Sequence, residues 1–201
     1  MTINMDPRIW QVLGLGLLAS CLALAALSDW RHRRIPNALV LVTLLAGLLL
    51  NAFGPQPFRQ NDGLFALYPG ALGWGSGLLG ALVALLVFLP FYALRVLGAG
   101  DVKLFAAVGA FAGPSASVNL ALCVLLAGGL LALARMVMER NARLVMRNTL
   151  VALGQMLPGS AGSFDAQTHT AWRMPYAVAI ALGVAAYAIW RLSGHDPILS
   201  F

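Results

Sequence analysis

The chain has 201 residues, of which 60% are hydrophobic and 10% are charged, and its formal net charge is +6. This composition excludes an ordinary soluble domain, because a water-exposed surface needs more charge. It also gives no support to nucleic-acid binding, since the basic residues lie in short segments between apolar runs, where membrane orientation and anionic lipid headgroups explain them. The composition therefore predicts an all-α polytopic membrane protein.

Apolar segments along the chain predict about six transmembrane helices within a single membrane domain, residues 1–201. Full crossings need about 20 apolar residues, so the fourth segment is short, and Gly113-Pro114 separates it from the fifth. A polar loop follows the second span from Gly54 to about Gly70, and a basic loop covers residues 135–173. The predicted spans are 9–28, 38–53, 71–97, 102–113, 116–134 and 174–191.

The first span ends at Asp29, in the segment Ser28-Asp29-Trp30-Arg31-His32-Arg33-Arg34-Ile35-Pro36-Asn37. Pro36 suits the start of the second helix, because a helix tolerates proline in its first turn. Asp29 has a plain alternative interpretation, as a solvated residue paired with the nearby arginines.

The third span is followed by Gly98-Ala99-Gly100-Asp101, which places a second carboxylate directly behind two glycines. An ionisable group costs about 2.5 to 3.5 kcal/mol at the centre of a membrane helix, so such groups usually serve transport, binding or catalysis. Because Gly98 and Gly100 lack a Cβ atom, a substrate strand can approach the backbone beside Asp101. The alternative is that Asp101 only caps the following helix.

The distribution of Lys and Arg orients these segments, because cytoplasmic loops collect positive charge. With six crossings, ten basic residues fall on one side and three on the other, which places both termini outside. Asp29 and Asp101 then share the cytoplasmic face. The ten are Arg31, Arg33, Arg34, Arg95, Lys103, Arg135, Arg140, Arg143, Arg147 and Arg173, against Arg8, Arg59 and Arg191.

Two neighbouring carboxylates at one membrane face suit peptide hydrolysis. At about 4 Å, two unit charges repel by about 4 kcal/mol at an effective dielectric of 20, so the pair shares one proton. The ionised Asp can take a proton from a water that attacks the scissile carbonyl, while the protonated Asp hydrogen-bonds the carbonyl oxygen. This chemistry needs no metal and no organic cofactor, and the three histidines are too scattered to suggest a metal site.

These residues resemble motifs of the prepilin peptidase family. Gly98-Ala99-Gly100-Asp101-Val102-Lys103 is similar to its G-x-G-D-x-K box, and the segment from Asp29 through Arg31, Pro36 and Asn37 resembles its other Asp-containing motif. Met174-Pro175-Tyr176-Ala177-Val178-Ala179-Ile180-Ala181 resembles the last span of its short Flp/Tad branch.

The resemblance implies a bundle like that of the GxGD aspartic proteases, with Asp29 and Asp101 as catalytic residues. Gly98, Gly100, Lys103, Arg31, Pro36, Asn37 and Pro175 are then expected to support the motifs or the approach of substrate. The implied activity is removal of the basic leader from a Flp/Tad-type prepilin or pseudopilin at the cytoplasmic face of the inner membrane. Components of a pilus or secretion assembly are further expected partners.

The chain departs from the long, bifunctional members of that family. It has no Cys-x-x-Cys pair and only a few residues before the first span. Both zinc and N-methyltransferase activity are therefore not expected.

Other readings of the sequence lead to different classes of protein. A small proton-coupled transporter or channel also places Asp residues at helix ends, although no internal repeat is visible. A non-catalytic scaffold of a pilus or secretion assembly needs the spans but not the acidic groups. Gly75-Ser76-Gly77-Leu78-Leu79-Gly80 satisfies the dinucleotide expression G-x-G-x-x-G, but it lies inside an apolar span, so we interpret it as a helix-packing motif.

Overall fold

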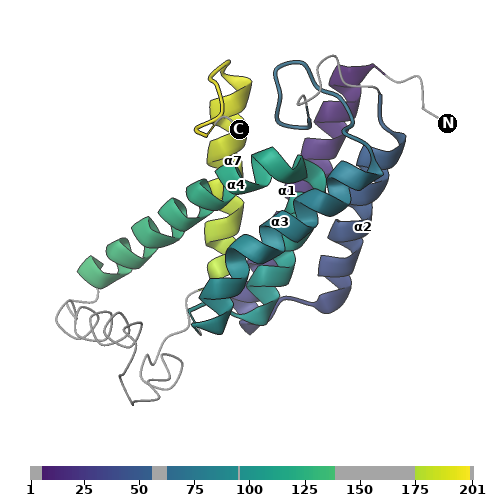
Figure 1. Ribbon diagram of the computed structural model, residues 1–201. Coiled ribbons are helices and arrows are strands. Elements are labelled where there is room, and N and C mark those ends of the chain that lie inside the picture. Colours follow the sequence, from purple (N-terminus) through teal and green to yellow (C-terminus); the bar gives the residue numbers. More distant parts are fainter. Residues whose placement is uncertain (1–5, 56–62, 95, 139–174, 200–201) are drawn as a thin grey trace.

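The computed structural model describes residues 6–55, 63–94, 96–138 and 175–199. These residues form helices and connecting turns without any strand, which confirms the all-α class (Figure 1). The helices are α1 (Pro7–His32), α2 (Asn37–Phe53), α3 (Trp74–Ala93), α4 (Ala99–Met138) and α7 (Tyr176–Leu192).

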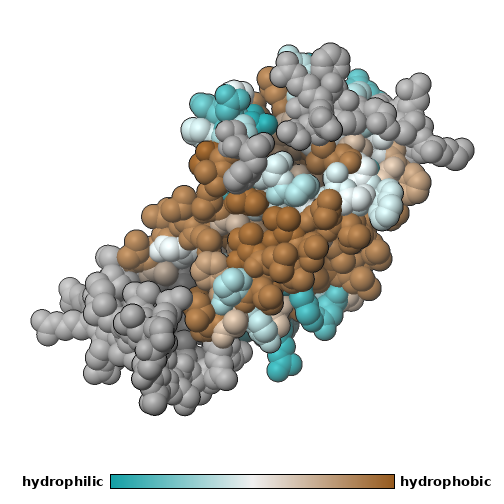
Figure 2. Space-filling model, in the orientation of Figure 1, coloured by the Kyte–Doolittle hydropathy of each residue, from teal (hydrophilic) through white to brown (hydrophobic). Residues whose placement is uncertain are grey.

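Three of the helices contain a stretch long and apolar enough to cross a membrane, namely Pro7–His32, Trp74–Ala93 and Ala99–Ala134. The other two, α2 and α7, are apolar but have 17 residues each. The face drawn in Figure 2 carries a broad hydrophobic band with hydrophilic residues toward its two ends. A membrane protein is the class that this surface requires.

The predicted count of about six spans is not confirmed, because only three helices of the described residues are long and apolar enough to cross a membrane. The predicted break between the fourth and fifth segments is confirmed. Residues 102–113 and 116–134 both lie in α4, whose backbone leaves helical geometry at Gly113, with φ 78° and ψ 173°. Gly113 adopts this left-handed φ without a Cβ clash, and Pro114 is tolerated where the helix resumes. We call residues 99–112 the first arm and residues 114–138 the second arm. The first four residues of the predicted basic loop, 135–138, are helical, and residues 139–173 lie outside the described part.

Polar side chains hydrogen-bond the backbone around this kink. The Asn51 amide nitrogen donates to the carbonyl oxygens of Ala110, at 2.8 Å, and Phe111, at 3.2 Å. The Ser117 hydroxyl donates to the carbonyl oxygen of Gly113 at 2.7 Å. Because unpaired backbone groups are costly in hydrocarbon, these bonds stabilise a bend that would otherwise leave carbonyls unsatisfied.

Glycines allow α3 and the first arm of α4 to pack backbone against backbone. A Cβ atom on Gly80 would overlap the Gly109 carbonyl oxygen and would lie 2.7 Å from the Gly113 backbone. Gly109 faces α3 in the same way, with Gly80 and Ala84 as its neighbours. The packing interpretation of Gly75–Gly80 is therefore confirmed at Gly80.

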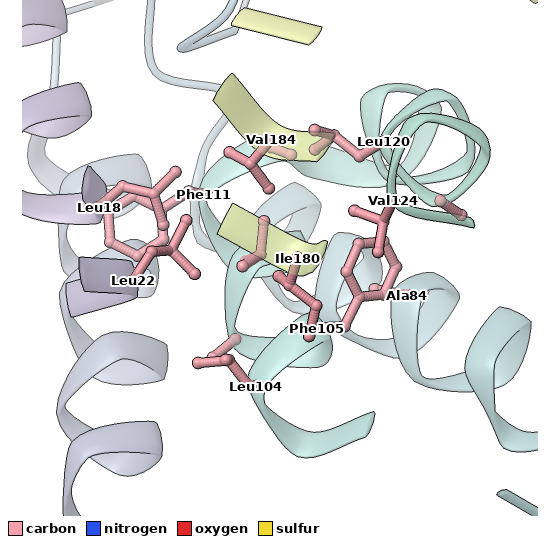
Figure 3. Packing of buried hydrophobic residues seen from close by; sticks show 14 of the residues in the cluster. Leu18, Leu22, Ala84, Leu104, Phe105, Phe111, Leu120, Val124, Ile180 and Val184 are labelled. Carbon is pink, nitrogen blue, oxygen red and sulfur yellow. The ribbon is translucent and has the colours of Figure 1, made fainter. Parts of the chain in front are cut away.

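The buried core lies where α1, α3, both arms of α4 and α7 meet (Figure 3). Its side chains are almost all aliphatic or aromatic, and Phe88 of α3 stacks on Phe105 of the first arm with ring centroids 4.0 Å apart. The loop before α3 also contributes, since Leu64 and Phe65 are 1% and 3% exposed. The polar character predicted for this loop is therefore wrong for these residues, which cover one end of the bundle.

Candidate active site

Three chain junctions meet at one end of the bundle, the lower end in Figure 1. They are the turn from α1 into α2, the turn from α3 into α4, and the start of α7. Gly100 of α4 faces Ile35 of the first turn, and a Cβ on Gly100 would lie 3.5 Å from the Ile35 Cβ. The beginning of α1 and the end of α7 lie at the opposite end of the bundle.

Asp29 lies in the last turn of α1 and is buried, with 8% of its surface exposed. The backbone N–H of Ala177, the second residue of α7, donates to Asp29 Oδ2 at 3.2 Å. The first N–H groups of a helix have no partner inside the helix, and the positive end of the helix dipole attracts anions. The start of α7 thus holds the Asp29 carboxylate, and the interpretation of Asp29 as a solvated surface residue is wrong.

The turn after Asp29 is fixed by its own hydrogen bonds. Arg33 has φ 52° and ψ 34°, in the left-handed region, and its N–H donates to the Asp29 carbonyl oxygen at 2.8 Å. The Ser28 hydroxyl donates to the Arg34 carbonyl oxygen at 2.9 Å. This geometry ends α1 directly after Asp29 and turns the chain toward Pro36.

Asp101 lies in the first turn of α4 and is half-buried. The Gly98 N–H donates to Asp101 Oδ2 at 3.1 Å, which is the bond that a side chain at the third helical position makes in a capping box. This hydrogen bond confirms that Asp101 caps the start of α4. It does not exclude catalysis, because Oδ1 takes no part in this bond.

Asp29 and Asp101 lie within electrostatic range of each other. Tyr176, the first residue of α7, also lies within electrostatic range of Asp101. Both carboxylates are thus held by backbone N–H groups at helix N-termini, at one end of the bundle. Two such groups can exchange protons with a water between them.

The remaining predicted site residues lie near Asp29 or Asp101 in the sequence or immediately before α7. Arg31, Pro36, Asn37 and Lys103 are exposed, and Pro36 is the residue immediately before α2. Pro175 is half-buried and stands immediately before α7. The supporting roles of these residues remain predictions.

Metal-binding side chains do not gather in the described part of the chain, where no three His, Cys, Asp or Glu residues come together. Cys21 and Cys123 are both free thiols. This end of the bundle thus presents two carboxylates held by backbone N–H groups, with exposed basic side chains such as Arg31 and Lys103 nearby in the chain.

Tyr176 and Ala177 belong to the segment that resembles the last span of the family, but no function was predicted for either residue. The available signal was Pro175 before an apolar run, since it marks a helix N-terminus at the face where Asp29 and Asp101 were predicted to lie. Hydropathy alone does not say which N-terminus meets which carboxylate.

Comparison with known proteins adds an independent result. The model of the type IV leader peptidase family matches residues 16–133, more than half of the chain, and this range includes both Asp29 and Asp101. No curated protein and no solved structure gives a significant match.

Proposed function

Because the chain belongs to the type IV leader peptidase family, we propose that it is an aspartic endopeptidase that uses Asp29 and Asp101 to remove prepilin leaders. The family implies peptide hydrolysis and prepilin-type substrates, and favours this function over a transporter or a scaffold. The observation that best supports the catalytic pair is the buried Asp29 carboxylate, which accepts a hydrogen bond from the start of α7 and lies within electrostatic range of Asp101.

The proposed reaction is a single hydrolysis. One ionised Asp takes a proton from the water between the carboxylates, and the oxygen of that water forms a bond to the scissile carbonyl carbon. The protonated Asp stabilises the carbonyl oxygen. Collapse of the tetrahedral intermediate breaks the C–N bond, and the leaving amine receives a proton from the pair. No metal or organic cofactor takes part.

We further propose that the substrate is a Flp/Tad-type prepilin or pseudopilin, cut at the cytoplasmic face of the inner membrane. The similarity of residues 174–181 to the short branch supports this substrate class. A multi-pass arrangement with both termini outside places Asp29 and Asp101 at the basic, cytoplasmic side. Anionic lipid headgroups near Arg31 and Lys103 would reduce the repulsion between that side and a basic leader.

The test is leader removal from a co-expressed Flp-type prepilin, followed by gel shift at matched enzyme levels in the membrane. Asp29→Asn and Asp101→Asn keep the volume of the side chain but remove its acid function, so each is expected to abolish cleavage. Asp196→Asn is the matched control, because Asp196 is exposed and follows the end of α7, which lies at the other end of the bundle.

Cleavage by the wild type and Asp196→Asn alone supports the pair. Equal cleavage by all four proteins shows that catalysis lies elsewhere. If the wild type fails on the Flp-type prepilin but cleaves another type IV prepilin, the proposed substrate branch is wrong, and the Asn variants are then compared on the prepilin that is cleaved.

A further inference from the structure

The second arm of α4 packs along α7 through two close contacts. At the middle of α7, a Cβ on Gly183 would lie 2.5 Å from Val124 Cα and 2.7 Å from Val124 N. At the start of α7, a Cβ on Gly128 would lie 2.9 Å from Tyr176 Cε2 and 3.0 Å from its hydroxyl oxygen. A glycine lets the other helix approach at each contact.

These contacts belong to one continuous helix face on each side. Val124 and Gly128 are four residues apart on the second arm, and Tyr176 and Gly183 are seven residues apart on α7, so each pair shares a face. The second arm thus supports α7 from its middle to its first residue. The Tyr176 ring occupies the notch that Gly128 leaves.

The first turn of α7 connects this contact to Asp29. Tyr176 is followed directly by Ala177, whose N–H donates to Asp29 Oδ2 at 3.2 Å. A hydrogen bond of this length depends on where the helix end lies, because its strength falls steeply when the donor moves or tilts. Whatever fixes Tyr176 therefore fixes the donor for Asp29.

We propose that Tyr176, seated in the notch at Gly128, is a positioning residue that holds the start of α7 where the Ala177 N–H meets Asp29. This inference rests on the proposed function, since it assigns Asp29 to catalysis. It gives the second arm of α4 a part in the reaction, although the first arm carries Asp101.

Adjacent glycines supply the experiment. Gly128→Ala places a methyl group against the Tyr176 ring, whereas a Cβ on Gly129 would meet nothing within 4 Å. We expect Gly128→Ala to lower kcat about tenfold or more, because displacements of about 1 Å at a reacting group cost up to about a hundredfold. KM should stay within about twofold, and Gly129→Ala should match the wild type. The assay uses the full-length enzyme in proteoliposomes with a cleavable prepilin.

Substitutions of Tyr176 separate the ring from its hydroxyl. Tyr176→Phe keeps the ring in the notch and should retain wild-type kcat, whereas Tyr176→Ala should lose as much as Gly128→Ala. Equal kcat for Gly128→Ala and Gly129→Ala would overturn the inference. A loss in Tyr176→Phe as large as in Tyr176→Ala would also overturn it, because the hydroxyl and not the seated ring would then be required.

Two further measurements keep the interpretation specific. Thermal unfolding in detergent identifies a Gly128→Ala protein that fails to fold, in which case the Tyr176→Phe and Tyr176→Ala pair decides. Asp29→Asn is assayed beside them. If Asp29→Asn cleaves normally, the proposed function fails, whereas an inactive Asp29→Asn beside a normal Gly128→Ala removes only the positioning role.

Discussion

The two ends of the first arm of α4 are built in different ways. At the Gly113 end, backbone packs on backbone, with Gly80 against Gly109 and with Asn51 bonded to the Ala110 and Phe111 carbonyls. At the Asp101 end, one oxygen of each carboxylate accepts a hydrogen bond from a backbone N–H. Asp101 accepts from Gly98, and Asp29 accepts from Ala177. One end therefore provides stability, while the other presents acidic groups whose second oxygen takes no part in these two bonds.

The largest effect is expected when either carboxyl group of the acidic pair is replaced by an amide. Asp29→Asn and Asp101→Asn should each lower kcat by about a thousandfold or more, which is about 4 kcal/mol of transition-state stabilisation. The double variant should be no slower than the poorer single variant, because residues that act as one unit are not additive. Single-turnover cleavage measures this, and two independent losses that multiply would contradict a shared mechanism.

A large effect on stability, without a primary effect on chemistry, is expected at the packed end. Gly80→Ala should destabilise the protein by about 1–3 kcal/mol, since the added methyl group overlaps the backbone of the first arm. Gly75→Ala is the control, because a Cβ there meets nothing within 4 Å. Within a helix, alanine is more favourable than glycine by up to about 1 kcal/mol. Thermal unfolding in detergent compares them, and equal midpoints would show that the close approach of α3 and α4 contributes little.

A smaller effect is expected beside Asp101 itself. A Cβ on Gly98 would lie 3.1 Å from Asp101 Oδ2, so Gly98→Ala must displace the carboxylate slightly. We expect kcat to fall about tenfold with the unfolding midpoint unchanged. A variant with normal kcat would show that the carboxylate tolerates this displacement.

The smallest effect is expected at Gly100, where a Cβ meets Ile35 at 3.5 Å, an ordinary van der Waals distance. Gly100→Ala should therefore fold and keep its kcat. If a substrate strand passes this glycine, KM should rise severalfold. An unchanged KM would mean that Gly100 serves only the packing of the turn.

The sequence predicted the class of the fold and the candidate pair, because both depend on local patterns. Apolar length gave the helices, and Asp29 and Asp101 stand out as carboxylates at the ends of apolar runs. The local part of the site was also readable, since the Gly98 N–H that meets Asp101 is three residues away.

Other features depend on distant contacts and were not predicted. The break at Gly113-Pro114 was predicted, but the hydrogen bonds that Asn51 and Ser117 donate to the backbone carbonyls beside it were not. Leu64 and Phe65 were assigned to a polar loop, but they are buried at the end of the bundle. The Ala177 donor for Asp29 could not be identified, because hydropathy does not determine how α1 and α7 pair.

The bond between Ala177 and Asp29 joins residues 148 positions apart, and this separation has a consequence during synthesis. Asp29 is inserted with the first helix, yet its backbone donor is absent until α7 has left the ribosome and entered the membrane. A nascent chain that already carries Asp29, Gly98 and Asp101 thus still lacks one hydrogen bond of its acidic pair. The order of translation therefore makes the completion of this site a late event. The acidic pair gains its last hydrogen bond only when the bundle around it has formed.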